Sequence, residues 1–182
     1  MGDGPDYQLH TDYFHFRLEV PVLGAWIGAG HDDRPSVSGN FEEYGTGGAY
    51  AGVRGCFDIL RPTSADGATG AFSGVGGGAC YAFLYDSAGN MQHRAGAGFD
   101  LFVLDNRLMF PIHLNYIYRE VSGSDPQHGG VLNIGVRHMF WRDRTDGRVL
   151  PFWGADIGLG GMGNRHGGFG FLELQAGMGV MF

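Results

Sequence analysis

The chain has 182 residues and a formal net charge of −7, which fits a single domain and argues against nucleic acid as a partner. All 12 basic residues are Arg, although Lys is the usual exposed cation and Arg serves where a cation is enclosed. The 35 glycines disfavour helices and follow no collagen period, and the 14% aromatic content excludes a flexible linker. No run of about 18 apolar residues, which a transmembrane helix needs, is present.

Clusters of turn-forming residues divide the chain into eight segments of similar length. Examples of these separators are Asp86–Asn90, Ser122–Pro126 and Asp143–Gly147. We predict strands over residues 13–28, 47–61, 71–86, 92–104, 107–119, 130–141, 149–161 and 169–182. The expected fold is therefore all-β, with one domain over residues 13–182.

Along these segments apolar residues alternate with polar residues and glycine, which is the period of a strand. The first segment places Phe14, Phe16, Leu18, Val20, Val22 and Trp26 on one face, opposite His15, Arg17 and Glu19. The fifth places Leu108, Phe110, Ile112, Leu114, Tyr116 and Tyr118 opposite Arg107, His113, Asn115 and Arg119. The eighth places Leu172, Leu174, Ala176, Met178, Val180 and Phe182 opposite Glu173 and Gln175. The apolar faces carry no Asp, Glu or Arg, and only His138 and Pro151 stand out.

The polar faces indicate which side points inward. A water-facing surface would be rich in Lys, Glu, Thr and Ser, whereas these faces are mostly Gly with single charged residues. Inward Gly would leave room for Arg inside a narrow barrel, and charges of both signs could pair there. We therefore predict an eight-stranded antiparallel up-and-down transmembrane β-barrel with a lipid-facing apolar wall. The predicted lumenal polar network is Arg17, Glu19, Arg54, Asp58, Arg94, Asp100, His113, Arg137, Asp156 and Glu173.

Aromatic residues gather near the strand ends on the apolar faces, as in the interfacial girdles of membrane barrels. They include Trp26, Tyr81, Phe83, Tyr85, Tyr116, Tyr118, Phe140, Trp153 and Phe182. With the alternation over residues 13–182 and the final strand Gln175–Phe182, this pattern resembles the small eight-stranded outer-membrane barrels of the OmpA, OmpX and opacity-protein type.

The resemblance implies that both termini are periplasmic and that residues 1–12 form a periplasmic extension. It implies extracellular connections at 29–46, 87–91, 120–129 and 162–168. Expected partners are outer-membrane lipid and lipopolysaccharide, the barrel-assembly machinery through Phe182, and a larger envelope complex. Residues Met1–Asp6 lack the basic and apolar parts of a signal peptide, so we expect that an export signal has been removed.

Three functions remain open. The first is a non-enzymatic barrel with a structural, adhesive or complex-forming role through its surface loops, with no cofactor. The second is a lipid-modifying outer-membrane enzyme with an acyl pocket in the lumen. His138, which faces lipid by its position, could be a catalytic His acting on a lipid, or else a His near the membrane interface or at a local bulge. The third is a soluble lipocalin-like carrier. No Ser-His-Asp set stands out, so we predict no catalytic residue.

Three smaller features have alternative interpretations. Cys56 and Cys80 lie on the inward faces of adjacent predicted strands. They could form a disulfide, or they could be two buried free thiols. The loops carry His31, Asp32, Asp33, Asp125, His128 and His166, which could bind a divalent metal if they converge, or else are solvated loop residues. The glycine runs at 74–78 and 160–163 are expected to be strand glycines, because a phosphate-binding loop must open a helix.

Overall fold

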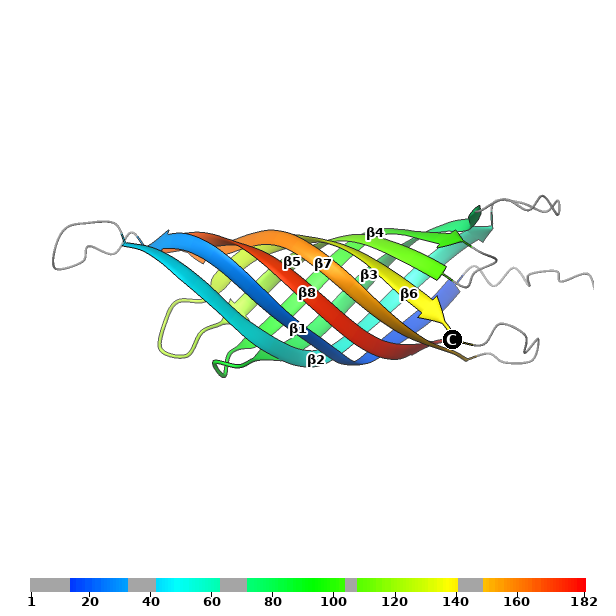
Figure 1. The fold of residues 1–182 in the computed structure, drawn as a ribbon, viewed down its shortest axis with the longest axis horizontal. Coiled ribbons are helices and arrows are strands. Elements are labelled where there is room, and N and C mark those ends of the chain that lie inside the picture. The colour runs from blue at the N-terminus through cyan, green and yellow to red at the C-terminus, as the bar shows by residue number, and fades with distance from the viewer. Residues whose placement is uncertain (1–13, 33–41, 63–71, 104–107, 141–148) are drawn as a thin grey trace, which may run out of the picture.

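The computed structural model describes residues 14–32, 42–62, 72–103, 108–140 and 149–182, which form eight β-strands (Figure 1). The strands are β1 (Phe14–Asp32), β2 (Glu42–Pro62), β3 (Phe72–Asp86), β4 (Met91–Val103), β5 (Leu108–Glu120), β6 (Gln127–Met139), β7 (Leu150–Asn164) and β8 (Gly167–Met181). No helix in these ranges has the length and hydropathy needed to span a bilayer.

Each strand pairs antiparallel with the next, and β8 pairs with β1 to close the barrel. The predicted all-β, up-and-down, eight-stranded fold is therefore confirmed. The tight connections at 87–90, 121–126 and 165–166 lie together at one end, which we name the turn end. The C-terminus lies at the opposite end, which we name the terminal end (Figure 1).

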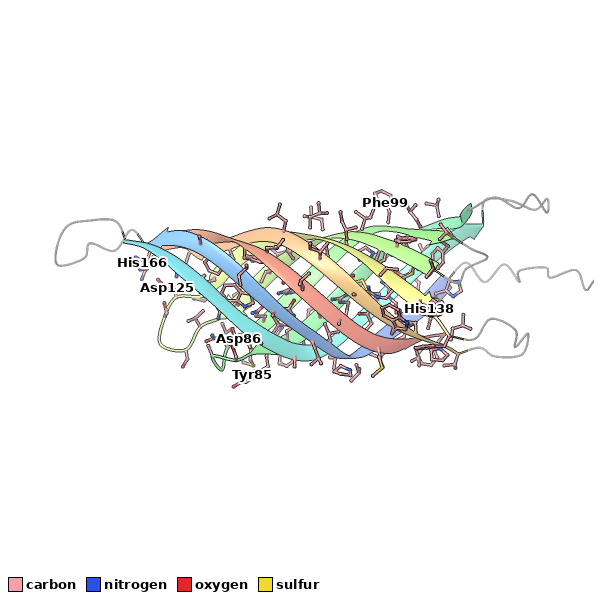
Figure 2. The ribbon with its side chains drawn as sticks, viewed as in Figure 1. Tyr85, Asp86, Phe99, Asp125, His138 and His166 are labelled. Atoms are coloured by element: carbon pink, nitrogen blue, oxygen red, sulfur yellow. A yellow bond between two sulfur atoms is a disulfide. The ribbon has the colours of Figure 1, made fainter. Side chains whose placement is uncertain are left out.

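The wall and the interior have opposite chemistry. Leu114 and Leu174 on the outer wall are 64% and 62% exposed, whereas Arg17 and Arg137 inside are 1% and 2% exposed. Figure 2 shows side chains projecting from the wall along the length of the barrel, with Phe99 among them. The alternation along each strand produces this arrangement, because successive side chains of a strand point to opposite faces.

One part of the predicted wall is wrong. Val22 and Trp26 lie inside the barrel, and Leu23 and Ile27 take their place on the wall. The cause is a register shift between Glu19 and Val22, where an irregularity adds one residue and reverses the in–out phase of β1. Pro21 marks this position in the sequence, since proline lacks the N–H that a regular ladder requires.

Two predicted connections are also shorter than expected. The predicted segment 29–46 includes strand residues, because Ala29 pairs with Gly45 and Asp32 with Glu42. Most of 162–168 is likewise strand, and only Arg165 and His166 form the turn. Strand pairing extends through these glycine-rich ends, whereas the glycines had led us to predict turns there. The glycine runs at 74–78 and 160–163 lie within β3 and β7, as expected.

The interior is divided into layers along the barrel axis. Toward the turn end lies a cluster that we name the aromatic plug: Val22, Trp26, Tyr50, Ala82, Leu84, Ile117, Val131, Met162, Phe169 and Phe171. Toward the terminal end lies a second cluster, the terminal plug: Phe102, Met109, Met139, Phe152 and Met181. Between the two plugs lies a layer of charged side chains.

Candidate functional site: the charged layer of the lumen

The structure places all ten residues of the predicted polar network inside the barrel, in one charged layer. Its centre is Arg137 on β6, which binds two carboxylates. Its guanidinium donates from Nη1 and Nη2 to the two Asp156 oxygens, at 2.7 and 2.8 Å, and its Nε lies 3.1 Å from Glu19 Oε1. Arg54 joins the same pair, 3.2 Å from Glu19 and 3.0 Å from Asp156.

The space for Arg137 comes from glycine on the neighbouring strand. A Cβ at Gly154 would overlap Cδ of Arg137, which is its cross-strand partner. Gly154 is therefore one position at which an inward glycine leaves room for an inward arginine, as predicted.

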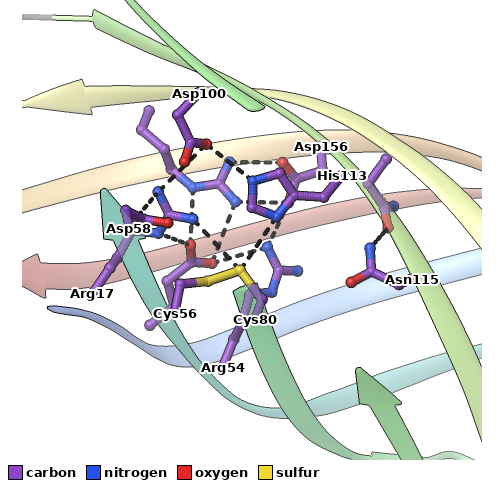
Figure 3. Close-up of a disulfide and its surroundings, with 12 residues drawn as sticks. Arg17, Arg54, Cys56, Asp58, Cys80, Asp100, His113, Asn115 and Asp156 are labelled. Atoms are coloured by element: carbon purple, nitrogen blue, oxygen red, sulfur yellow. Dashed lines mark hydrogen bonds and ion pairs between the residues drawn. A yellow bond between two sulfur atoms is a disulfide. The ribbon is translucent and has the colours of Figure 1, made fainter. Parts of the chain in front are cut away.

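A second group surrounds the disulfide between Cys56 and Cys80, directly opposed residues of β2 and β3 (Figure 3). His113 Nδ1 lies 3.2 Å from Cys80 Sγ, and its Nε2 lies 3.0 Å from Asp100 Oδ1. Arg17 Nη1 lies 3.3 Å from Asp58 and donates to the sulfur of Met109. The charged layer, the disulfide and the terminal plug thus contact one another and form one continuous interior.

A third group is centred on Glu173 of β8. Arg94 binds its Oε1 at 2.8 Å and stacks over the ring of Tyr50, 4.8 Å from the centroid. The hydroxyl of Tyr50 donates to the other oxygen, Oε2, at 3.0 Å. Asn133 and Gln175 donate further hydrogen bonds to Oε1. The carboxylate therefore accepts hydrogen bonds from three other strands, β2, β4 and β6, and from its own strand.

The alternation along the strands placed Asn115, Asn133 and Gln175 on the polar faces, but the predicted network did not include them. Tyr50 was not assigned to either face. It lies at an inward position of its strand, so the same alternation could have found it.

The layer is closely balanced in charge. Among the described residues it contains four guanidiniums, from Arg17, Arg54, Arg94 and Arg137. It contains five carboxylates, from Glu19, Asp58, Asp100, Asp156 and Glu173, together with His113. The cavity within the layer measures about 20 Å³, which is room for about one water molecule. Ion pairs across the lumen link the strands through this layer.

A smaller polar group, the mouth clasp, lies at the turn end beyond the aromatic plug. Arg119 Nε donates to Asp86 Oδ2 at 2.8 Å, while Asp86 Oδ1 accepts from the backbone of Ala88 and Asn90. Arg119 also donates to Gln127 at 2.9 Å. The clasp ties β3, β5, β6 and the 87–90 turn together. Sequence reasoning did not include Asp86, because it lay within a turn cluster.

The predicted metal ligands do not converge within the described part of the chain, where no group of three or more His, Cys, Asp or Glu side chains forms a metal site. His166 lies 3.2 Å from Asp125 across two turns. His128 points to the outer wall, where its Nδ1 contacts the Tyr116 hydroxyl. Asp33 and the side chains of His31 and Asp32 lie outside the described residues.

His138, the candidate catalytic His of the enzyme alternative, lies on the outer wall, as the alternation along its strand predicts. Its ring contacts are with Phe140 and Trp153, whose centroids lie 5.9 and 6.0 Å away. Figure 2 places it toward the terminal end of the barrel, far from the turn-end residues Asp86 and Asp125.

Comparison of the chain with protein-family models, with curated proteins and with solved structures gave no match.

Proposed function

We propose that the chain is an integral outer-membrane β-barrel protein with a non-enzymatic, structural or complex-forming role. One observation carries the proposal: large apolar side chains cover the outside of the closed barrel, while charged side chains fill its interior. A soluble protein rarely exposes contiguous apolar patches larger than a few hundred Å². Lipid is the solvent in which such a wall is stable, and a closed barrel leaves no unpaired strand edge in it.

Aromatic residues support this orientation. Phe16, Trp153 and Phe182 are exposed near the terminal end, and Tyr81, Tyr85 and Tyr116 are exposed toward the turn end. Two such zones at opposite ends of an aliphatic wall match the two interfaces of a bilayer. By the family resemblance, the terminal end would be periplasmic and the turn end extracellular.

The described connections at the turn end are short: 87–90, 121–126 and 165–166. The wall and the turns are then the surfaces on which a partner of a larger envelope complex would bind.

The two other candidate functions gain no support from the interior. A lipid-modifying enzyme needs an acyl pocket, and a cavity of about 20 Å³ is far smaller than an acyl chain. A lipocalin-like carrier needs an apolar interior and a polar wall, which is the reverse of the arrangement of Leu114, Leu174 and Arg137.

Lipid contact can be tested with brominated lipids, which quench nearby Trp fluorescence. Trp153 lies on the wall and Trp26 in the aromatic plug, so each single-Trp variant controls for the other. The full chain would be refolded into phosphatidylcholine vesicles as W26F/W141F, which retains Trp153, and as W141F/W153F, which retains Trp26. We expect severalfold stronger quenching of Trp153. Equal quenching, or a chain that stays folded and monomeric in detergent-free buffer, would refute the proposal.

A further inference from the structure

A row of aromatic and imidazole side chains crosses four strands on the outer wall. Phe83 of β3, His93 of β4, Tyr118 of β5 and His128 of β6 are consecutive cross-strand partners. The ring of Tyr118 lies between the two imidazoles, with centroid distances of 6.0 Å to His93 and 5.3 Å to His128. We name these four residues the histidine row.

Two tyrosines fix the two imidazoles in the same way. The Tyr81 hydroxyl lies 2.6 Å from His93 Nδ1, and the Tyr116 hydroxyl lies 2.5 Å from His128 Nδ1. When the phenol donates to Nδ1, the proton of the neutral imidazole is on Nε2, which becomes a donor. The β3–β4 and β5–β6 hairpins thus repeat one arrangement, in which a hydroxyl orients a histidine whose Nε2 has no hydrogen-bond partner among the described residues.

The row lies near the turn end of the apolar wall. On its terminal side the wall continues with Ala97, Leu114 and Leu132. On its turn side lie the exposed Tyr85 and Met91 together with Glu120, followed by the turns. The cross-strand partner of His128 on the next strand is Gly163, which has no side chain to cover the imidazole.

Cation-forming groups are scarce on this surface. The chain has no Lys, and the Arg side chains that the structure describes in the strands point inward. Among the described outward-facing strand residues, His93, His128 and His138 are therefore the groups that can become cations. His93 and His128 share one row, whereas His138 lies toward the terminal end.

We propose that the histidine row binds the phosphate of a membrane lipid headgroup, with the Nε2 atoms of His93 and His128 and the Tyr118 hydroxyl as donors. This inference rests on the proposed membrane location. Phosphate suits the row because it accepts several hydrogen bonds at once and favours imidazoles that can take up a proton. The lipid-borne form is favoured over free phosphate because the row adjoins the apolar wall, where acyl chains would hold the headgroup at this height. Glu120 lies on the turn side of the row, and its negative charge is expected to weaken the binding of an anion.

Native mass spectrometry of the full chain in detergent micelles tests this directly. The probes are dioleoyl phosphatidic acid and, as the matched zwitterionic control, dioleoyl phosphatidylcholine. We expect at least tenfold tighter binding of one phosphatidic acid. The double variant H93Q/H128Q should lose this preference, H138Q should keep it, and E120Q should strengthen it.

Several outcomes would overturn the inference: no preference in the parent chain, a preference that survives in H93Q/H128Q, or full competition by inorganic phosphate, which would indicate a site for the free anion. A dimer mass that depends on His93 and His128 would instead assign the row to a second copy of the chain. If H93Q/H128Q does not fold, Y81F/Y116F removes the orienting hydroxyls and should weaken the preference. Because binding is measured in micelles, its failure is distinct from failure of the bilayer quenching test.

Discussion

Replacing Arg137 with Met tests whether the charged layer stabilises the barrel. Methionine retains much of the side-chain length but removes the guanidinium that binds Asp156 through two bonds and Glu19 through a third. Removing one partner of a buried ion pair costs about 3–5 kcal/mol, because an uncompensated charge remains in a low-dielectric interior. Arg54 still contacts both carboxylates, so we expect a loss near the lower limit, about 3 kcal/mol.

A second substitution shows whether the stranded charge causes this loss. In R137M/D156N one of the two carboxylates that lose Arg137 is neutralised. We expect the double variant to recover about 1.5 kcal/mol, the lower value for hydrogen bonds to charged groups. The assay is urea unfolding of the chain in phosphatidylcholine vesicles, followed by Trp fluorescence, with heat-modifiable gel migration as the test of folding.

Arg165 provides the matched control. It pairs with Asp125 at 2.7 Å, as close as Arg137 to Asp156, but its side chain is 74% exposed. Because exposed ion pairs contribute about 1 kcal/mol or less, R165M should leave the unfolding free energy nearly unchanged. If R137M and R165M behaved alike, both within about 1 kcal/mol of the parent, the stabilising role assigned to the charged layer would be wrong.

Three further predictions concern the wall, the disulfide and a glycine. Leu174→Arg should cost about 2–4 kcal/mol in vesicles, as expected for a cation facing lipid near the bilayer centre, whereas Leu174→Ala should cost less; equal effects in urea unfolding would argue against lipid contact. C56A/C80A should lower the unfolding free energy by about 3 kcal/mol, since the bridge closes a loop with a sequence separation of 24; an unchanged urea midpoint would contradict this. Gly52→Ala should destabilise the barrel by about 1–3 kcal/mol, because the added Cβ would lie 2.8 Å from the Cα of Leu84. The control Gly55→Ala should be nearly neutral in the same assay, because its Cβ would lie at an ordinary contact distance of 3.6 Å from the Phe16 ring.

The fold and the network could be predicted because side chains at odd and even positions of a strand point to opposite faces. A strand alternates strictly, so one correctly phased segment assigns every side chain in it to the wall or the interior. This is why Arg94, Asp100 and Glu173 could be placed inside from the sequence alone. The same reasoning failed at Trp26, because the irregularity at Pro21 reverses the phase of β1 beyond it.

The partners across the lumen could not be predicted in this way. Tyr50 and Glu173 are 123 residues apart, and Arg137 and Glu19 are 118 apart. Which inward residues meet depends on the stagger between strands around the whole barrel. That stagger is fixed by the pairing of β8 with β1, which cannot be predicted from the residue pattern of a single strand.

The charged layer restricts the pairing register of the strands in a way that the apolar wall does not. Sliding one strand by one residue would turn its apolar face inward, so the alternating wall excludes that error. Sliding by two residues preserves the alternation, and an apolar interior would discriminate weakly against it. In this barrel the same slip would move Arg137 by about 6–7 Å, which is twice the rise per residue of a strand, and would separate it from Asp156. We infer that the buried ion pairs select the register among those the wall permits, at a cost in desolvation that an apolar core would not incur.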